Sequence, residues 1–434
     1  MMQKTEYPSI GDTMYRDTLP NGLRISVITK PGYTRCFAFF ATNYGGADRR
    51  FRLGGEYIDT PSGVAHFLEH KMFDMPEGDN ALAVLAANGA QPNAYTSSGI
   101  TAYHFDSTEN FDENLRTLLH FVSTPYFTEE SVAKEQGIIG QEIRMCEDNP
   151  DHVIYEELIK CLYERHPLRE SVVGTVESIA QITPETLYNC HRIFYNPGNM
   201  ALAVVGDVDP EAVRRAAMEV LPPEAGEVPG RDYGAPEGPL PAKPRFQRAM
   251  EVSAPQFIIG AKLDTCPGGT ELLRQKILAG IALNYLYGQS SPFYSRLYAD
   301  GLLNTDFFVD MDDAANTMTL LAGGESRDPE SVFEQFCAEA EAAAKNGLDP
   351  AYFERTKRSG YGSRIRALSS FSGLCASMAS ADFGGYNCLD AFAVTEAITE
   401  QDVREFIKTN LCRERLAMSV IVPASGKERD ERDA

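Results

Sequence analysis

The sequence has no Cys-x-x-Cys pair and no even set of cysteines of the kind that builds a disulfide framework. Its nine cysteines are scattered over 434 residues, a pattern typical of free thiols in a reducing compartment. No apolar run approaches the roughly 20 residues that a helix needs to cross a bilayer. The first residues also lack the apolar core of a secretory signal. We therefore expect a soluble cytoplasmic protein with no membrane span and no cysteine-based metal site.

Basic residues are scarce relative to acidic ones. The chain has 40 Lys and Arg against 62 Asp and Glu, which is a formal net charge of -22. This balance disfavours nucleic acids and anionic membranes as partners, because both would be repelled. A solvated acidic surface is the simplest explanation, whereas carboxylates gathered in a cavity would attract basic ligands.

Histidine is absent from the second half of the chain. The last of the seven histidines is His191. A metal site that uses imidazole ligands must therefore belong to the first half.

The length of the chain predicts more than one domain. Prolines and glycines are concentrated in residues 222–245, where they would interrupt any helix or central strand. We interpret this stretch as a linker between a first domain, 1–221, and a second domain, 246–434.

Both halves show strand patterns mixed with helix patterns. Strands are expected at 23–28, 36–42, 91–105, 200–205, 256–263, 316–322 and 416–423. Helices are expected at 111–122, 128–147, 153–164, 184–194, 209–221, 272–287, 291–300, 329–345, 350–368 and 399–409. This order indicates an α+β protein of two related domains, each an antiparallel-rich sheet with helices packed on one face.

Residues 63–73 read Gly-Val-Ala-His-Phe-Leu-Glu-His-Lys-Met-Phe and carry the most informative motif. We expect a helix here that begins near Thr60, the predicted N-cap, with a proline directly after it. His66 and His70 are four residues apart, so both imidazoles project from one face and suit one zinc ion. Glu69 lies at the edge of that face, where a carboxylate could take a proton from a metal-bound water.

A lone histidine in such a helix would more simply be a buried core residue. The combination His-x-x-Glu-His arises by chance in a chain of this length on the order of a per cent of the time. A hydrolytic zinc site also needs a third protein ligand, which is either another histidine or a carboxylate brought in by folding.

The segment 134–145 offers the best carboxylates for that third position. Glu135 and Glu142 are seven residues apart, so they share one face of the predicted helix. Ile138, Ile139 and Ile143 make the neighbouring stripe apolar. Two acids beside such a stripe are costly to bury unless a cation compensates them, although a half-exposed helix with solvated glutamates would show the same pattern.

The inverted order His-x-x-Glu-His and the downstream Glu-x6-Glu pair resemble the insulinase, or pitrilysin, family of inverzincin zinc peptidases. The likeness covers most of the chain and is nearest to the half-length bacterial type, similar to the subunits of mitochondrial processing peptidase. The resemblance implies one zinc ion per chain, held by His66, His70 and Glu142. It implies that Glu69 is the general base.

Further roles follow from the same resemblance. It implies that Glu135 orients a ligand or water from outside the metal's own ligands. It also implies that Asn93, Ala94, Tyr95 and Thr96 form an edge strand to which a peptide substrate adds as an extra strand.

One part of the family pattern is missing. Complete active sites of this family also receive an Arg and a Tyr, seven residues apart, from a C-terminal half. Here the equivalent positions hold Leu297 and Asn304, while Arg296 is one residue out of register and Leu303 lies seven beyond it. We therefore expect the metal-bearing subunit of a heterodimer, completed by a second half-length chain.

These observations favour a zinc metallo-endopeptidase that cleaves peptides or small unfolded polypeptides. The alternative is a non-catalytic assembly or peptide-binding subunit of the same fold. Relatives of that kind have generally lost the metal motif, which is intact in this chain.

Overall fold

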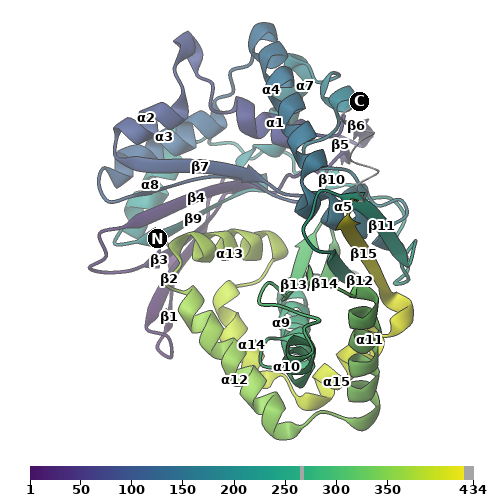
Figure 1. Ribbon diagram of the computed structural model, residues 1–434. Coiled ribbons are helices and arrows are strands. Elements are labelled where there is room, and N and C mark those ends of the chain that lie inside the picture. The colour runs from purple at the N-terminus through teal and green to yellow at the C-terminus, as the bar shows by residue number, and fades with distance from the viewer. Residues whose placement is uncertain (264–267, 425–434) are drawn as a thin grey trace. The chain divides into compact units, whose positions relative to one another are not determined.

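The computed structural model describes residues 1–263 and 268–424, and these fall into two compact units (Figure 1). Unit 1 consists of Met1–Ile143, Glu170–Tyr233 and Arg364–Cys388. Unit 2 consists of Arg144–Arg169, Gly234–Ser363 and the residues from Leu389 on. Each unit therefore takes segments from both sides of the Pro- and Gly-rich stretch 222–245.

Both units combine a mainly antiparallel sheet with packed helices, which confirms the predicted α+β class. In unit 1 the seven-stranded sheet has the order β1-β2-β3-β9-β4-β8-β7, in which only β3 and β9 pair in parallel. Its strands are β1 (Gln3–Tyr7), β2 (Asp12–Thr18), β3 (Arg24–Thr29), β4 (Cys36–Thr42), β7 (Ala90–Thr96), β8 (Thr101–Ser107) and β9 (Met200–Gly206). A small sheet pairs β10 (Gly230–Arg231), β5 (Arg50–Leu53) and β6 (Glu56–Asp59).

The core of unit 1 lies around the central strands β4 and β9. Every residue of both strands is buried, as expected for continuous apolar runs with both faces of the sheet covered. The unit's helices are α1 (Val64–Lys71), α2 (Ala81–Ala87), α3 (Phe111–Ser123), α6 (Val176–Ile179), α7 (Pro184–Phe194), α8 (Pro210–Val220) and α13 (Phe371–Gly384), and α4 (Glu129–Asp148) runs from unit 1 into unit 2. In Figure 1, α3 and α8 lie on one side of the sheet and α13 on the other, against β4 and β9.

Unit 2 is built on a five-stranded sheet of order β11-β15-β12-β14-β13. Its strands are β11 (Arg245–Met250), β12 (Gln256–Leu263), β13 (Phe308–Ala314), β14 (Thr317–Glu325) and β15 (Leu416–Pro423). Its helices are α5 (Pro150–Leu162), α9 (Gly269–Tyr287), α10 (Pro292–Ala299), α11 (Pro329–Asn346), α14 (Ala391–Ala397) and α15 (Glu400–Asn410), and α12 (Pro350–Ala367) runs from unit 2 into unit 1. Helix α5 packs its apolar side on β11, β15 and β12.

A short sequence signal starts six of these helices. In each, a polar side chain accepts a hydrogen bond from the first turn, and a proline with its preset φ follows directly. The pairs are Asn149-Pro150, Thr183-Pro184, Asp209-Pro210, Ser291-Pro292, Asp328-Pro329 and Asp349-Pro350.

Three local predictions were wrong. The expected strand 91–105 is a hairpin of two strands, β7 and β8, joined by a turn at residues 97–100. The helix that carries the His-x-x-Glu-His motif begins at Val64, not near Thr60, whose hydroxyl instead contacts the Arg49 carbonyl at 3.2 Å. Ile138 is 47% exposed and does not belong to the buried stripe of Ile139 and Ile143.

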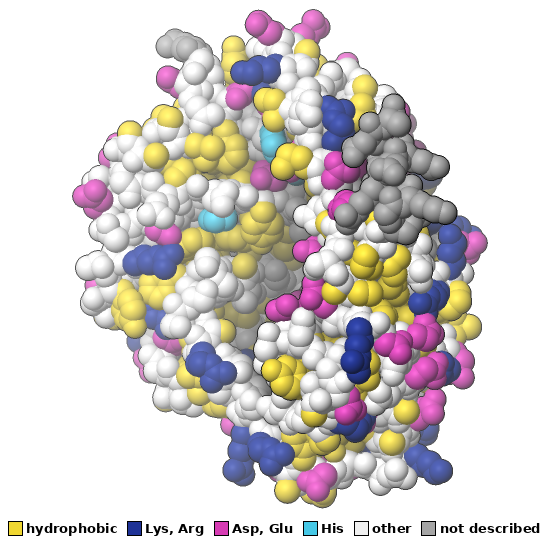
Figure 2. Space-filling view, viewed as in Figure 1, with side chains coloured by type: hydrophobic (Ala, Val, Ile, Leu, Met, Phe, Trp, Pro, Cys, Tyr) yellow, Lys and Arg dark blue, Asp and Glu magenta, His cyan; other side chains and the backbone are white. Residues whose placement is uncertain are grey.

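The exposed surface carries charged side chains of both signs (Figure 2). On the face drawn in Figure 2, acidic and basic side chains are interspersed over most of the surface. In the described part of the chain, no helix is both long enough and apolar enough to span a bilayer. No disulfide joins any of the eight described cysteines to another, and Cys266 lies outside the described residues.

Glu237 ties the Pro- and Gly-rich stretch to the end of α5 within unit 2. Its carboxylate accepts the backbone N–H groups of Glu164, Arg165 and His166 at 2.7–2.8 Å, and the buried Lys262 ammonium lies 3.3 Å away. Burial alone would raise the pKa of Glu237, but these four donors outweigh it and lower the pKa to about 2. The interaction therefore stabilises the fold above the ordinary carboxyl pKa and is lost as the pH falls toward 2.

We predict that Glu237→Gln lowers the unfolding free energy of unit 2 by about 2 kcal/mol at pH 7. The substitution removes the charge that the three N–H groups bind and leaves the Lys262 ammonium without its partner. Urea unfolding at pH 7 and at pH 3 measures the effect, and the difference from wild type should shrink at pH 3. Glu341→Gln on the exposed side of α11 is the control. An equal loss at both pH values would contradict the linkage.

Candidate metal centre

Helix α1, which carries the His-x-x-Glu-His motif, packs against β7, β8 and α7. Its N-cap is Gly63, whose φ of 90° favours glycine. A Cβ at Gly63 would lie only 2.8 Å from the Val173 carbonyl oxygen, so no other residue fits this close approach. Phe67 and Leu68 are fully buried and anchor the helix, which leaves the histidine face directed toward α4.

The structure brings Glu142 of α4 to the two histidines. Its Oε1 lies 3.5 Å from His66 Nε2, and its Oε2 lies 3.5 Å from His70 Nε2. One ligand atom from each of the three residues falls within 4.8 Å of the others. Two turns of α4 also bring Glu135 to the same helix face. Glu142 lies more than seventy residues downstream of both histidines in the sequence.

This donor set fits a single zinc ion. Ligand atoms about 2.05 Å from a tetrahedral ion are about 3.3 Å from one another. The observed separations of 3.5 Å between nitrogen and oxygen are close to that value. Two imidazoles and one carboxylate are also the ligands of a hydrolytic zinc site that keeps its fourth position open. Among the described residues, no other group of His, Cys, Asp or Glu is arranged to hold a metal.

Glu135 orients His70 by a contact to Nδ1, the ring nitrogen that does not face Glu142. Its Oε1 lies 3.0 Å from His70 Nδ1, so a neutral His70 that donates from Nδ1 presents Nε2 to the metal position. Burial lowers the pKa of His70, but the hydrogen bond to Glu135 and the charge of Glu142 outweigh it, so the pKa is raised overall. The hydrogen bond from His66 lowers the pKa of Glu142, which keeps this carboxylate ionised. Protons and metal therefore compete for these groups.

Lys71 is a buried cation that sequence reasoning did not single out. It is 2% exposed, forms an ion pair with Asp74, and has its Nζ 3.8 Å from Glu135 Oε2. A buried ammonium needs such partners. The i,i+3 spacing of Lys71 and Asp74 could have indicated their ion pair from the sequence. The contact with Glu135 could not be predicted in this way, because it depends on how α4 packs against α1.

His66 is held differently from His70. It is only 7% exposed, and its Nδ1 has no hydrogen-bond partner among the described residues. The two rings lie with centroids 4.6 Å apart at 60° to one another. Packing, not an outer carboxylate, therefore fixes the orientation of His66.

Glu69 is positioned by Thr96 at the end of β7. The Thr96 hydroxyl donates to Glu69 Oε2 at 2.6 Å, and Thr101 lies 3.3 Å from the same hydroxyl. Glu69 is not one of the three residues whose ligand atoms converge, so its carboxylate lies outside that donor set. Thr96, expected only as a substrate-binding position, thus also orients the carboxylate of Glu69.

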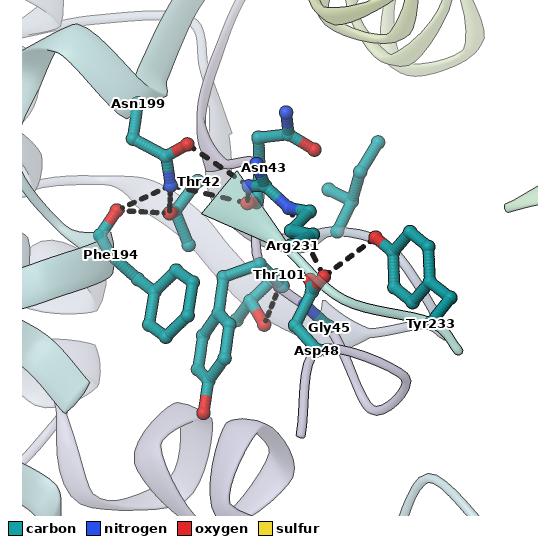
Figure 3. Close-up of polar contacts among 12 residues, drawn as sticks. Thr42, Asn43, Gly45, Asp48, Thr101, Phe194, Asn199, Arg231 and Tyr233 are labelled. Atoms are coloured by element: carbon teal, nitrogen blue, oxygen red, sulfur yellow. Dashed lines mark hydrogen bonds and ion pairs between the residues drawn. The ribbon is translucent and has the colours of Figure 1, made fainter. Parts of the chain in front are cut away.

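A network of buried polar groups supports the turn that follows β7 (Figure 3). The Thr101 hydroxyl donates to the Tyr44 carbonyl at 2.9 Å, and Gly46 N–H donates to the Ser97 carbonyl at 3.0 Å. A Cβ at Gly45 would lie 2.4 Å from the Gly99 nitrogen, so this close approach requires glycine.

Arg231 stabilises the loop of residues 43–48, which contacts the turn after β7. This guanidinium bonds the Asn43 carbonyl, lies 3.1 Å from Asp48 Oδ1 and 3.1 Å from Asn199 Oδ1 (Figure 3). The amide of Asn199 bonds in turn to the Phe194 carbonyl at 2.8 Å. Asn199 therefore helps to hold the loop beside the candidate site in place.

The predicted substrate strand lies at an open sheet edge. Asn93, Ala94, Tyr95 and Thr96 belong to β7, the last strand of the seven-stranded sheet. Ser97 N–H bonds the Ile100 carbonyl at 2.8 Å, so alternation along the hairpin directs the backbone of Thr96 and Ala94 away from β8. Ala94 N–H donates to Asn93 Oδ1 at 2.9 Å, as expected for a backbone group that points away from β8.

The residues expected at the positions of the family's Arg/Tyr pair lie in unit 2, where they make other contacts. Leu297 is fully buried, and the Asn304 amide is bonded to Glu325 at 3.2 Å. Arg296 forms an ion pair with Glu339 at 3.1 Å.

Loss of the outer carboxylate should weaken metal binding without abolishing it. We predict that Glu135→Gln reduces zinc affinity roughly 10- to 100-fold, because His70 loses the partner that fixes its tautomer. Competition with a chromophoric chelator measures the change. Glu130→Gln, on the exposed first turn of the same helix, should bind zinc like the wild type. Equal affinities for the Glu135 variant and this control would contradict the assigned role.

Comparison with known proteins finds similarity along the whole chain. The family model described as Insulinase (Peptidase family M16) matches residues 54–176, and the one described as Peptidase M16 inactive domain matches residues 181–359. A Bacillus subtilis (strain 168) relative, named uncharacterized zinc protease YmfH, is 35% identical over 98% of this chain and 100% of its own length.

Solved structures extend this similarity to the fold. A crystal structure of an M16-like protein from Alicyclobacillus acidocaldarius matches with a TM-score of 0.91 and 32% identity, over 97% of this chain and 100% of that one. A protease from Helicobacter pylori matches with a TM-score of 0.80 over 94% of this chain and 99% of that one. At 19% identity, the second likeness is one of fold alone.

Proposed function

Because the chain belongs to the insulinase family of peptidases, we propose that it is a zinc-dependent metallo-endopeptidase that hydrolyses peptides or small unfolded polypeptides. The observation that carries this proposal is the meeting of His66, His70 and Glu142, with Glu69 beside them and outside the donor set. A structural helix would have no reason to assemble these three donors at the spacing of a zinc ion.

In the proposed mechanism, His66, His70 and Glu142 would hold one zinc ion. Bound there, zinc would polarise the substrate carbonyl and lower the pKa of a water toward neutrality. Glu69 takes the proton of the attacking water and passes it to the leaving amine. The Thr96 hydroxyl holds the Glu69 carboxylate in place by its 2.6 Å bond, so little reorganisation is needed during the reaction.

Substrate binding is proposed at the open edge of β7. The outward N–H and C=O groups of Ala94 and Thr96 can pair with an extended peptide, which then runs past Glu69. Main-chain pairing of this kind tolerates varied side chains, as an enzyme acting on unfolded polypeptides requires. The Asn93 side chain, which bonds Ala94 N–H in the free protein, has to release it when a peptide arrives.

We also propose that a second half-length chain completes the active site. The chain has Leu297 and Asn304 at the positions where the family carries an Arg and a Tyr, and Arg296 is engaged with Glu339. Without that pair, the transition-state oxyanion lacks two of its stabilising donors. This chain would then be the metal-bearing subunit of a heterodimer.

A digestion assay tests both parts of the proposal. Purified chain, alone and mixed with a candidate half-length partner, is incubated with unfolded peptides, with and without a chelator. Chelator-sensitive cleavage that needs the partner supports the two-chain enzyme, whereas full activity of the single chain refutes the partner requirement. Zinc binding without cleavage under any combination would favour the alternative, a non-catalytic peptide-binding subunit.

A further inference from the structure

Two buried tyrosines bring their hydroxyl groups together on the face of the unit 1 sheet that carries the Thr96 side chain. Tyr103 of β8 is fully buried, and Tyr195, the C-cap of α7, is 4% exposed. Their hydroxyl oxygens lie 2.9 Å apart. Thr96 pairs with Thr101 in the hairpin, and Tyr103 is two residues further along β8, so the three side chains share one face. Helix α7 packs against α1, which brings Tyr195 to the same place.

Packing accounts for the two rings but not for their hydroxyl groups. The Tyr103 ring contacts Phe73 and Phe121, each with centroids 5.8 Å apart, and the Tyr195 ring lies 4.7 Å from His191. Phenylalanine would make the same ring contacts. A buried hydroxyl is costly unless it is hydrogen-bonded, so the hydroxyl groups call for a separate explanation.

Both hydroxyl groups lie close enough to Glu69 to be affected by its charge. Burial raises the pKa of Tyr103 and of Tyr195, and the Glu69 carboxylate adds to the rise in each case. The hydrogen bonds that Tyr195 makes with Tyr103 and Thr101 lower its pKa, but they do not outweigh burial. Both tyrosines are therefore neutral at ordinary pH and can donate hydrogen bonds.

The two threonines of the hairpin each use their single hydroxyl proton. Thr96 donates to Glu69 Oε2 at 2.6 Å, and Thr101 donates to the Tyr44 carbonyl at 2.9 Å. The two hydroxyl oxygens also lie 3.3 Å apart, so Thr101 restricts where the Thr96 hydroxyl can lie. The orientation of Glu69 therefore depends on what holds Thr101.

The remaining hydrogen bonds run in one direction. Because the Thr101 proton is already donated, its oxygen accepts from Tyr195. Tyr195 accepts in turn from Tyr103, for which it is the only hydrogen-bond partner among the described residues. Thr101 is thus held at its oxygen by Tyr195 and at its proton by a backbone carbonyl, and Tyr103 completes the bonding of Tyr195.

We propose that Tyr195 is a positioning residue for Glu69. Its hydroxyl fixes Thr101, Thr101 fixes the Thr96 hydroxyl, and that hydroxyl holds the carboxylate in the orientation needed to take a proton from water. This inference rests on the proposed function, because it gives Tyr195 a part in the proposed hydrolysis. Tyr103 satisfies the hydrogen bonding of Tyr195 and has no direct bond to either threonine.

Three variants separate positioning from stability. Tyr195→Phe leaves the Tyr103 hydroxyl buried without a partner, so urea unfolding should show a lower midpoint than in the wild type. The double variant, Tyr103→Phe with Tyr195→Phe, removes both hydroxyl groups and should regain much of that loss. Tyr103→Phe alone keeps the bond from Tyr195 to Thr101.

Kinetics of zinc-loaded protein then distinguish the variants, measured under the conditions in which the wild type is active. The kcat of Tyr195→Phe and of the double variant should fall roughly 10- to 100-fold, with KM and zinc affinity within about twofold of wild type. Tyr103→Phe should keep kcat within about threefold. The control, Tyr287→Phe, removes another fully buried hydroxyl, which donates to the Phe336 carbonyl at 2.9 Å in unit 2, and should leave kcat unchanged.

Crystal structures of the metal-free variants provide a readout that does not depend on catalysis. In Tyr195→Phe, the distance from the Thr96 hydroxyl to Glu69 Oε2 should exceed about 3.5 Å, beyond the range of a hydrogen bond. In Tyr103→Phe, this hydrogen bond should be retained.

Two results would overturn the proposal. If kcat recovered together with stability in the double variant, the tyrosines would act through packing alone. If the hydrogen bond from Thr96 to Glu69 were unchanged in Tyr195→Phe, Tyr195 would not position the carboxylate. A wild-type chain without chelator-sensitive cleavage would instead refute the proposed function, and the structures would still decide whether Tyr195 positions Glu69.

Discussion

A Glu69→Gln variant should keep its zinc and lose most of its peptidase activity. Glutamine has the shape of glutamate and can still accept the Thr96 hydrogen bond, but it cannot take a proton from water. General-base catalysis typically contributes roughly 10²–10⁴-fold, so kcat should fall by that factor with little change in KM. Peptide hydrolysis under saturating substrate, together with zinc analysis of the same sample, measures both quantities.

The control for this variant is Glu130→Gln, which makes the same chemical change at an exposed position of α4. It should retain wild-type activity and zinc content. If the Glu69 variant retained more than a tenth of wild-type kcat, another group would have to be the base. If it lost its zinc instead, Glu69 would be acting as a ligand or as a support of the metal-bearing helix.

The parts of the fold that follow from local sequence were predictable. Strands 36–42 and 256–263 coincide with β4 and β12 because an unbroken apolar run of that length is typical of a buried strand. The pairs of polar cap and proline likewise mark helix starts by local chemistry alone. The histidine spacing in α1 belongs to the same class, since a helix places residues i and i+4 on one face whatever surrounds it.

The features that depend on tertiary contacts were not predictable in this way. Gly63, not a threonine cap, starts α1, because the backbone at Val173 leaves no room for a side chain. Helix α13 was missed altogether. It is rich in small and apolar residues, and its buried Asp382 bonds Arg16 at 2.8 Å and Ser26 at 2.8 Å across more than 350 positions of sequence. Nothing near Asp382 in the sequence indicates those partners.

The role of Glu142 could be predicted only in part from the sequence. The seven-residue spacing from Glu135 predicted that both acids share a helix face, but only the resemblance to a peptidase family assigned that face to the histidines. The packing of α4 on α1 is what brings Oε1 and Oε2 to 3.5 Å from the two imidazole nitrogens. For the same reason, Lys71 was not recognised as a neighbour of Glu135.

Replacing Glu142 by glutamine should therefore have the largest effect on metal binding. A neutral amide oxygen is a poor zinc ligand, and the variant leaves two imidazoles where a stable site needs three protein donors. Loss of an outer partner alone costs roughly 10- to 100-fold in affinity, so loss of a direct ligand should cost more than about 100-fold. Chelator competition measures the affinity, with Glu135→Gln intermediate and Glu130→Gln unchanged.

Thermal unfolding gives a second measurement that does not depend on catalysis. Zinc that binds only the folded wild-type chain adds about 2.7 kcal/mol of stability at a free concentration 100 times its dissociation constant. The Glu142→Gln chain should gain at most about 0.4 kcal/mol from zinc at that concentration, and so show little rise in its unfolding temperature. Its metal-free form should unfold close to wild type, because the half-exposed carboxylate is not part of a buried apolar cluster. A variant that still gained the full zinc-dependent stabilisation would show that the third ligand is another residue, and the proposed metal centre would have to be abandoned.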